Sequence, residues 1–193
     1  MRPTYEMTIL NLGATGSATG LETQFESSYS WPERVTGGGP NMAELLDYRR
    51  SFPAITAIAF DGCALPFRDA SFDLVYSNAV IEHLSPEQQQ RFANEVQRVG
   101  RGWFIATPNR WFPVEPHYHL PFIQFLPQAQ QRALAAFAGR VPYPVLNLLG
   151  RSDLRRLFPA SKIIGCRVTL YAETLIALRA PQTARRVNLI AFG

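Results

Sequence analysis

The stretch that decides the fold is FDGCALPFRDASFDLVYSNAVIEHL, residues 60–84. An apolar run, residues 55–60, leads into it and is expected to form a buried strand that ends at Asp61. A second strand is expected over residues 72–77, and Asn78 follows it directly. Polar residues therefore come just after two neighbouring strands, where parallel sheets bind ligands.

The same alternation extends to both sides of this stretch. Further strands are expected over residues 7–12, 34–36 and 103–107, and helices over residues 21–29, 42–50 and 86–99. Asn41 and Ser85 stand at the N-cap positions of two of these helices. Strands that alternate with helices at this spacing predict βαβ units and an α/β fold with a mostly parallel sheet.

The pattern changes after residue 110. Residues 110–150 are rich in proline and aromatic residues, contain an expected helix over residues 128–138, and are interpreted as a lid or insertion over the strand ends. Beyond it we expect a short helix capped by Ser152 or Asp153, a hairpin of strands over residues 162–169 and 173–179, and a tail, residues 186–192, apolar enough to form a further edge strand.

Composition narrows the class of protein. The net charge is +4, and Lys162 is the only lysine among the basic residues. The arginines are dispersed rather than gathered in a run, so no nucleic-acid partner is expected. Cys63 and Cys166 lie far apart without metal-ligand neighbours, which favours reduced thiols and a cytoplasmic location. No signal peptide or transmembrane segment is expected.

Residues 60–84 contain the motifs D-G-C-A-L-P-F, D-A-S-F-D-L-V and E-H-L, in this order. This pattern resembles that of the small-molecule, type 11-like branch of the class I S-adenosylmethionine (SAM) dependent methyltransferases. A looser similarity covers residues 9–107. The resemblance implies a Rossmann-like sheet of seven strands, mostly parallel with an antiparallel last strand, in one domain over residues 1–193. It also implies SAM as cofactor and a small-molecule acceptor; the sequence does not indicate an oligomeric state.

The resemblance further implies a SAM site at the strand ends. Its residues would be Asn11, Gly13, Thr15, Gly16, Gly39, Asp61, Gly62, Cys63, Asn78, Val80 and His83. The glycine bend after the first strand would approach the methionine and ribose, and Asp61 would accept a hydrogen bond from the adenine amino group. We therefore expect Asp61 and Gly13 to line one continuous cavity.

Two positions depart from the family's pattern. Asn11 and Gly39 stand where the family usually has acidic residues, and the second of those acids binds the ribose hydroxyls. The loss of one charged hydrogen-bonding partner costs about 1.5–3 kcal/mol, or roughly tenfold to a hundredfold in affinity. Glu44 is a candidate replacement. An alternative function is therefore a non-catalytic binding or partner subunit with the methyltransferase fold.

Methyl transfer to a hydroxyl or amine needs a group that takes up a proton. Candidate catalytic residues are His83, Glu115 and His117, with His119 as a further possibility. His117 and His119 lack a defined third ligand, so no metal is expected.

A less favoured alternative is an NAD(P)-dependent short-chain reductase. Residues 9–16 resemble the glycine-rich loop of atypical members of that family, but Gly20 comes one place late. The usual Tyr-x-x-x-Lys pair is also absent, since no tyrosine lies four residues before Lys162.

Overall fold

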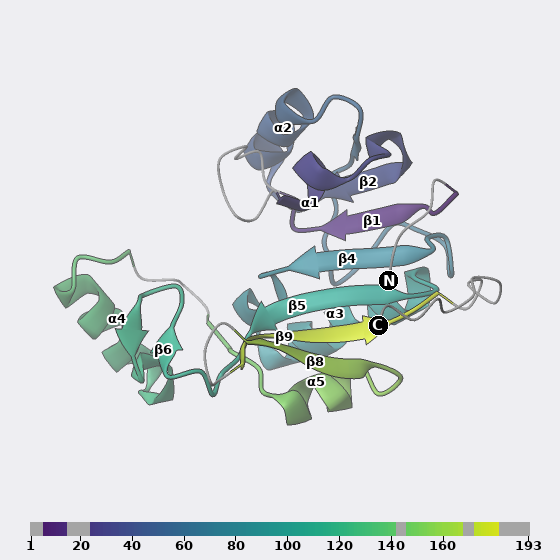
Figure 1. Ribbon diagram of the computed structural model, residues 1–193. Helices are drawn as coiled ribbons and strands as arrows, with labels where there is room; N and C mark the ends of the chain where they lie inside the picture. The colour runs from purple at the N-terminus through teal and green to yellow at the C-terminus, as the bar shows by residue number, and fades with distance from the viewer. Residues whose placement is uncertain (1–5, 15–23, 142–145, 168–171, 182–193) are drawn as a thin grey trace.

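The computed structural model describes residues 6–14, 24–141, 146–167 and 172–181. Its main sheet has the strand order β3-β2-β1-β4-β5-β9-β8 (Figure 1). The strands are β1 (Ile9–Leu12), β2 (Val35–Gly38), β3 (Thr56–Ala57), β4 (Leu74–Asn78), β5 (Trp103–Pro108), β8 (Lys162–Arg167) and β9 (Ala172–Arg179). The first five are parallel, and β9 runs antiparallel to both β5 and β8. The predicted sheet of seven strands with an antiparallel last strand is confirmed.

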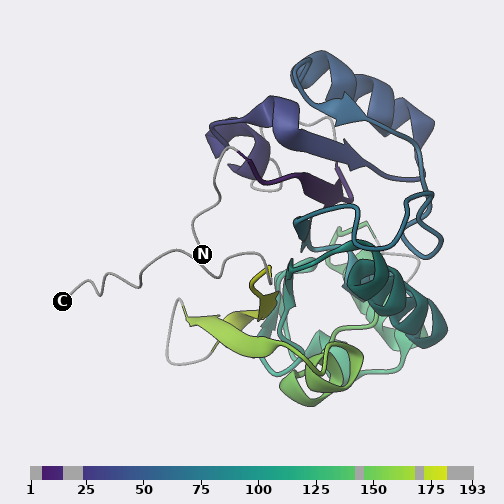
Figure 2. The same ribbon diagram turned by 90° about the vertical axis from the view of Figure 1, so that its right-hand side faces the viewer.

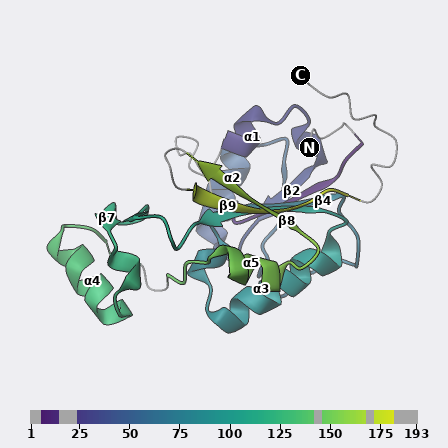
Figure 3. The ribbon, with the colours of Figure 1, turned by 60° about the horizontal axis from the view of Figure 1, so that its bottom comes forward.

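Helices cover the two faces and the edges of this sheet. They are α1 (Gln24–Ser28), α2 (Met42–Ser51), α3 (Pro86–Val99) and α5 (Arg151–Leu157), with short 3-10 turns η2 (Pro32–Arg34) and η3 (Ile81–His83). Figure 3 shows α3 and α5 together on one side of the sheet, and Figure 2 shows α2 at one end of it and α5 beside the β8–β9 hairpin at the other. Within the described ranges, no helix has both the length and the apolar character needed to cross a membrane.

The helix starts follow the capping residues in the sequence. The Asn41 side chain accepts hydrogen bonds from the first-turn amides of α2, and Ser85 forms a capping box with Gln88 at the start of α3. Both predicted N-caps are confirmed, and each satisfies amides that the helix itself leaves unpaired. The cap predicted for α5 was wrong: Gly150 occupies it, and its amide donates to Asp153 at 2.9 Å.

The alternation of apolar side chains along β1 divides the core between the two faces. Leu10 and Leu12 pack in a cluster with Phe92 and Val96 of α3, whereas Ile9 packs in a second cluster with Tyr48 of α2. Because successive strand residues point to opposite faces, a short run of apolar residues buries both faces of a central strand.

The third strand is shorter than expected. β3 covers only two residues, although the amides of Ile58 and Phe60 still donate to the carbonyls of Gly37 and Gly39 at 3.0 and 3.2 Å. The chain therefore stays beside β2 up to Asp61, without forming a regular strand.

Residues 110–148 leave and rejoin the domain at one place, where the Arg110 amide donates to the Leu149 carbonyl at 3.0 Å. This segment contains β6 (Val114–Glu115), β7 (Leu120–Pro121), η4 (Ile123–Phe125) and α4 (Gln128–Phe137), and it extends beyond the carboxyl ends of β4 and β5 (Figure 1). It has its own small core around Tyr118, Ile123 and Ala135. The expected tail strand, residues 186–192, lies outside the described residues.

Candidate functional site

A cavity of about 400 Å³ lies at the carboxyl ends of β1, β2 and β4. Its volume falls in the range of small-molecule and cofactor sites. Predicted site residues that line it are Asn11, Gly13, Gly39, Asn78, Val80, His83 and His117, together with Glu44, the candidate replacement for the acid. Residues that were not predicted are Leu12, Ala14, Pro40, Tyr76, Ala79 and Leu84. Thr15 and Gly16 lie outside the described residues. The sheet therefore brings together residues that are up to about a hundred positions apart in the chain.

The bend after β1 closes one side of this cavity. Gly13 has a positive φ of 82°, and its amide donates to the Gly38 carbonyl at 3.0 Å. A Cβ added at Gly13 would overlap Cγ2 of Val80. Ala79, just before Val80, has a φ of 54°, a conformation that is costly for a residue with a side chain. The close approach of these two turns requires glycine at position 13.

A carboxylate reaches the cavity from α2 rather than from the end of β2. Gly39 lines the cavity, and no atom of the described residues lies within 4 Å of a Cβ built on it. Glu44, in the first turn of α2, also lines the cavity, and its Oε1 accepts a hydrogen bond from Asn41 Nδ2 at 2.9 Å. Glu44 therefore lies at the same edge of the cavity as Gly39, the position at which the family usually has an acid.

Asn11 also has a carboxylate beside it. Its Nδ2 donates to Oε1 of Glu26, a residue of α1, at 2.5 Å, and both side chains are buried. Burial raises the pKa of Glu26 above its ordinary value. No sequence pattern indicated this pair, because it joins a strand to a helix across fifteen residues.

Asp61, Gly62 and Cys63 are not among the residues that line the cavity, so the prediction that Asp61 and Gly13 share one cavity was wrong. The Asp61 side chain is exposed and accepts a hydrogen bond from the Cys63 amide at 2.8 Å, which folds it back on its own turn. The turn remains near the cavity, because the neighbouring Phe60 donates to Gly39. Burial raises the pKa of the Cys63 thiol.

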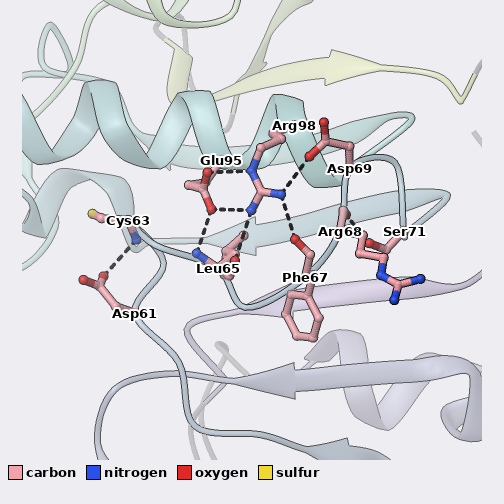
Figure 4. A network of polar contacts seen from close by, with 9 residues as sticks. All are labelled: Asp61, Cys63, Leu65, Phe67, Arg68, Asp69, Ser71, Glu95 and Arg98. Carbon is pink, nitrogen blue, oxygen red and sulfur yellow. Dashed lines mark hydrogen bonds and ion pairs between the residues drawn. The ribbon is translucent and has the colours of Figure 1, made fainter.

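The loop that follows Asp61 is held by one arginine of α3 (Figure 4). The Arg98 guanidinium donates to the carbonyls of Leu65 and Phe67 at 3.0 and 2.7 Å, and it forms ion pairs with Glu95 and Asp69 at 2.7 and 2.9 Å. Glu95 also accepts from the Leu65 amide at 2.7 Å. The L-P-F-x-D part of the sequence pattern is thus a structural support for the loop, and Arg98 was not among the predicted residues.

Two histidines face each other in the cavity wall. The rings of His83 and His117 meet edge to face, with centroids 5.0 Å apart. Glu115 does not line the cavity: it is fully buried, its Oε1 lies 2.6 Å from Nδ1 of His117, and its Oε2 accepts from the Tyr118 amide at 2.7 Å. Glu115 therefore orients His117. His119 is exposed at the turn between β6 and β7 and does not line the cavity.

Glu82 is an acid beside the cavity for which the sequence predicted no role. It is fully buried beside His83, and its Oε2 accepts from the Thr107 hydroxyl at 2.9 Å. Burial raises the pKa of Glu82 to about 7. Among the described residues, Glu82, His83 and His117 each offer a possible metal-ligating atom, and these atoms lie within 4.8 Å of one another.

Residues 15–105 match a family model described as a methyltransferase domain. An uncharacterized protein of Mycobacterium tuberculosis strain H37Rv is 37% identical over 51 residues, which is 26% of this chain. The match spans only 17% of that relative's own length.

Solved structures with a similar fold include a SAM-dependent methyltransferase from Methanosarcina mazei, with a TM-score of 0.61, 15% identity, and coverage of 92% of this chain and 94% of that one. A protein from Pyrococcus horikoshii has a TM-score of 0.60, 16% identity, and coverage of 91% and 82%. The antiparallel β9 also distinguishes the sheet from the all-parallel dinucleotide-binding order expected for the reductase alternative. Residues 15–105 therefore match a methyltransferase domain, and the chain has the fold of the class I SAM-dependent methyltransferases.

Proposed function

We propose that the protein binds SAM in the cavity at the carboxyl ends of β1, β2 and β4, and transfers its methyl group to a small-molecule acceptor. The observation that carries the proposal is this cavity of about 400 Å³, bordered by the Gly13 bend and by Glu44, within a methyltransferase domain. Such a site at the ends of parallel strands is where this class of sheet binds its ligands.

In this proposal the amino-acid part of SAM lies against Gly13 and Asn78, and the ribose hydroxyls face Glu44. Glu44 then supplies the carboxylate that Gly39 lacks, and the helix cap at Asn41 holds it in place. The adenine extends toward Asp61, whose loop is fixed by Arg98. This last placement requires Asp61 to turn from its own loop toward the ligand.

When bound, SAM supplies an electrophilic methyl group whose bond to sulfur breaks as the acceptor's lone pair attacks, which leaves S-adenosylhomocysteine. A hydroxyl or amine acceptor must also lose a proton. His83 and His117 line the cavity and are the side chains positioned to take it, and Glu115 acts only through His117. The remaining contribution of the protein is alignment of the two reactants and exclusion of water.

Residues 110–150 serve in this proposal as a lid over the acceptor. The segment leaves and returns at Arg110 and Leu149, and it carries His117 into the cavity wall. Its small separate core, with Tyr118 and Ile123, lets it move as a unit.

Calorimetric titration with SAM and with S-adenosylhomocysteine tests the proposal. We expect a dissociation constant below about 100 μM for the unaltered protein. Glu44→Gln should weaken binding roughly tenfold, because it removes a charged hydrogen-bond acceptor. Asp47→Asn is the matched control, since Asp47 is an exposed acid of the same helix that pairs with Arg50 and does not line the cavity.

Absence of binding heat for both ligands would contradict the proposal and favour the non-catalytic subunit. Equal losses in Glu44→Gln and Asp47→Asn would remove Glu44 from the site. Detection of S-adenosylhomocysteine as a product, with candidate acceptors added one class at a time, then identifies the acceptor.

A further inference from the structure

Three side chains at the histidine end of the cavity have the composition of a transition-metal site. Glu82 and His83 come from η3, and His117 comes from the turn after β6. Their possible ligand atoms lie within 4.8 Å of one another. Ligand atoms around one tetrahedral ion lie roughly 3.4 Å apart, so a bound ion would draw the three side chains closer together. Two imidazoles and one carboxylate are a recurrent ligand set for zinc and for non-haem iron.

The carboxylate of this group has an unsatisfied oxygen. Glu82 is fully buried, and while its Oε2 accepts from Thr107, its Oε1 has no hydrogen-bond partner among the described residues. A buried carboxylate oxygen without a partner is costly, and proteins normally avoid it. A cation at this point would supply the missing partner.

The histidine from the insertion is also arranged as metal ligands usually are. Glu115 lies 2.6 Å from Nδ1 of His117, an arrangement that favours a proton on Nδ1 and makes Nε2 the nitrogen that would bind a metal. Glu115 is itself held by the Tyr118 amide. A buried carboxylate that fixes the tautomer and orientation of a ligating histidine is the usual outer support of a metal site.

We propose that Glu82, His83 and His117 bind one divalent transition-metal ion, with Glu115 as the group that orients His117. This inference departs from the expectation of no metal, which considered His117 and His119 as a pair without a third ligand. The third ligand comes from Glu82, and His119 has no part in the site.

The position of the ion suggests its use. His83 and His117 line the same cavity in which SAM is proposed to bind, so three protein ligands would leave a coordination position open toward the acceptor. An acceptor hydroxyl bound there would lose its proton to water more readily than a free hydroxyl. This role rests on the proposed function, whereas the binding of the ion does not.

Cobalt(II) is the probe, because its visible spectrum reports coordination by nitrogen and oxygen ligands in the absence of SAM. Protein freed of metal by chelation is titrated with Co²⁺ and, in competition, with Zn²⁺. We expect one equivalent of Co²⁺ with visible absorption bands, displaced by one equivalent of Zn²⁺ and little affected by excess Mg²⁺.

The variants His83→Ala and His117→Ala should each lose the bands and the stoichiometric binding. His119→Ala is the matched control, an exposed histidine two positions from His117, and it should bind like the unaltered protein. Circular dichroism of each variant shows whether the fold is intact, and His117→Asn provides a second variant if His117→Ala fails to fold.

Absence of stoichiometric Co²⁺ binding by the unaltered protein, or bands that survive in both folded histidine variants, would overturn the metal site. Because SAM is left out of this titration, a protein that binds SAM and no metal refutes only this inference. A protein that binds the metal and no SAM refutes only the proposed function.

Discussion

Gly39→Asp should strengthen SAM binding, because it adds a carboxylate at the end of β2 where the family usually has one. The structure has space for it: Gly39 lines the cavity, and no described atom lies within 4 Å of a Cβ at this position. Its φ is also outside the left-handed region, so a side chain causes no backbone strain.

The size of the effect depends on Glu44, which lines the same edge of the cavity. A charged hydrogen-bond partner for the ribose hydroxyls contributes about 1.5–3 kcal/mol, or roughly tenfold to a hundredfold in the dissociation constant. In the presence of Glu44 the gain should be smaller, since two carboxylates would share one edge and repel each other. In a Glu44→Gln background the full gain should appear.

The assay is calorimetric titration with SAM on four proteins: the unaltered chain, Gly39→Asp, Glu44→Gln and the double variant. Gly39→Ala serves as the control that adds a Cβ without charge, and it should bind like the unaltered protein. We expect the double variant to recover at least the affinity that Glu44→Gln loses.

A folded double variant that binds no better than Glu44→Gln would refute this placement of the ribose. An equal gain from Gly39→Ala would show that backbone rigidity, and not the carboxylate, is responsible.

Three further predictions concern the support of the site. Gly13→Ala should cost about 1–3 kcal/mol of unfolding free energy in urea denaturation, because of its positive φ and the overlap with Val80, and a cost no larger than that of Gly39→Ala would contradict this. Arg98→Gln should speed amide hydrogen exchange across residues 64–70 and weaken SAM binding, although Arg98 does not line the cavity; unchanged exchange would rule out its role in holding the loop. Glu26→Gln should change the pH dependence of stability: burial raises the pKa of Glu26 in the folded state, so its contribution is full below about pH 4.5 and declines as the pH rises through the folded-state pKa. The neutral glutamine avoids this decline, so the variant should gain stability relative to the unaltered protein as the pH rises above about 4.5, and parallel urea-denaturation profiles would contradict the assignment.

Much of the fold follows from short-range signals in the sequence. Asn41 and Ser85 are capping residues next to helix formers, and apolar runs such as residues 9–12 have the length of buried strands. These signals are local, and the structure confirms them with small shifts at the boundaries. The resemblance over residues 60–84 added the number of strands and the antiparallel last strand, which no local signal contains, whereas the strand order came from the structure.

The site was only partly predictable. Gly13 and Asn78 line the cavity as predicted because both lie at the carboxyl ends of strands, and these ends meet at one edge of a parallel sheet. The direction in which a side chain points could not be predicted in this way. The Asp61 side chain accepts a hydrogen bond within its own loop, and the Glu115 side chain contacts His117. Those orientations depend on which hydrogen-bond partner is nearest in the folded chain.

The sequence by itself determined the class of fold, the edge of the sheet at which the cavity lies, and the absence of an acid at the end of β2. Only the tertiary structure decided that Glu44 reaches this edge, that Arg98 holds the Asp61 loop, and that Glu82 and His83 meet His117. The physical reason is that these contacts join elements distant in sequence, and their geometry is fixed by packing of the whole domain rather than by neighbouring residues.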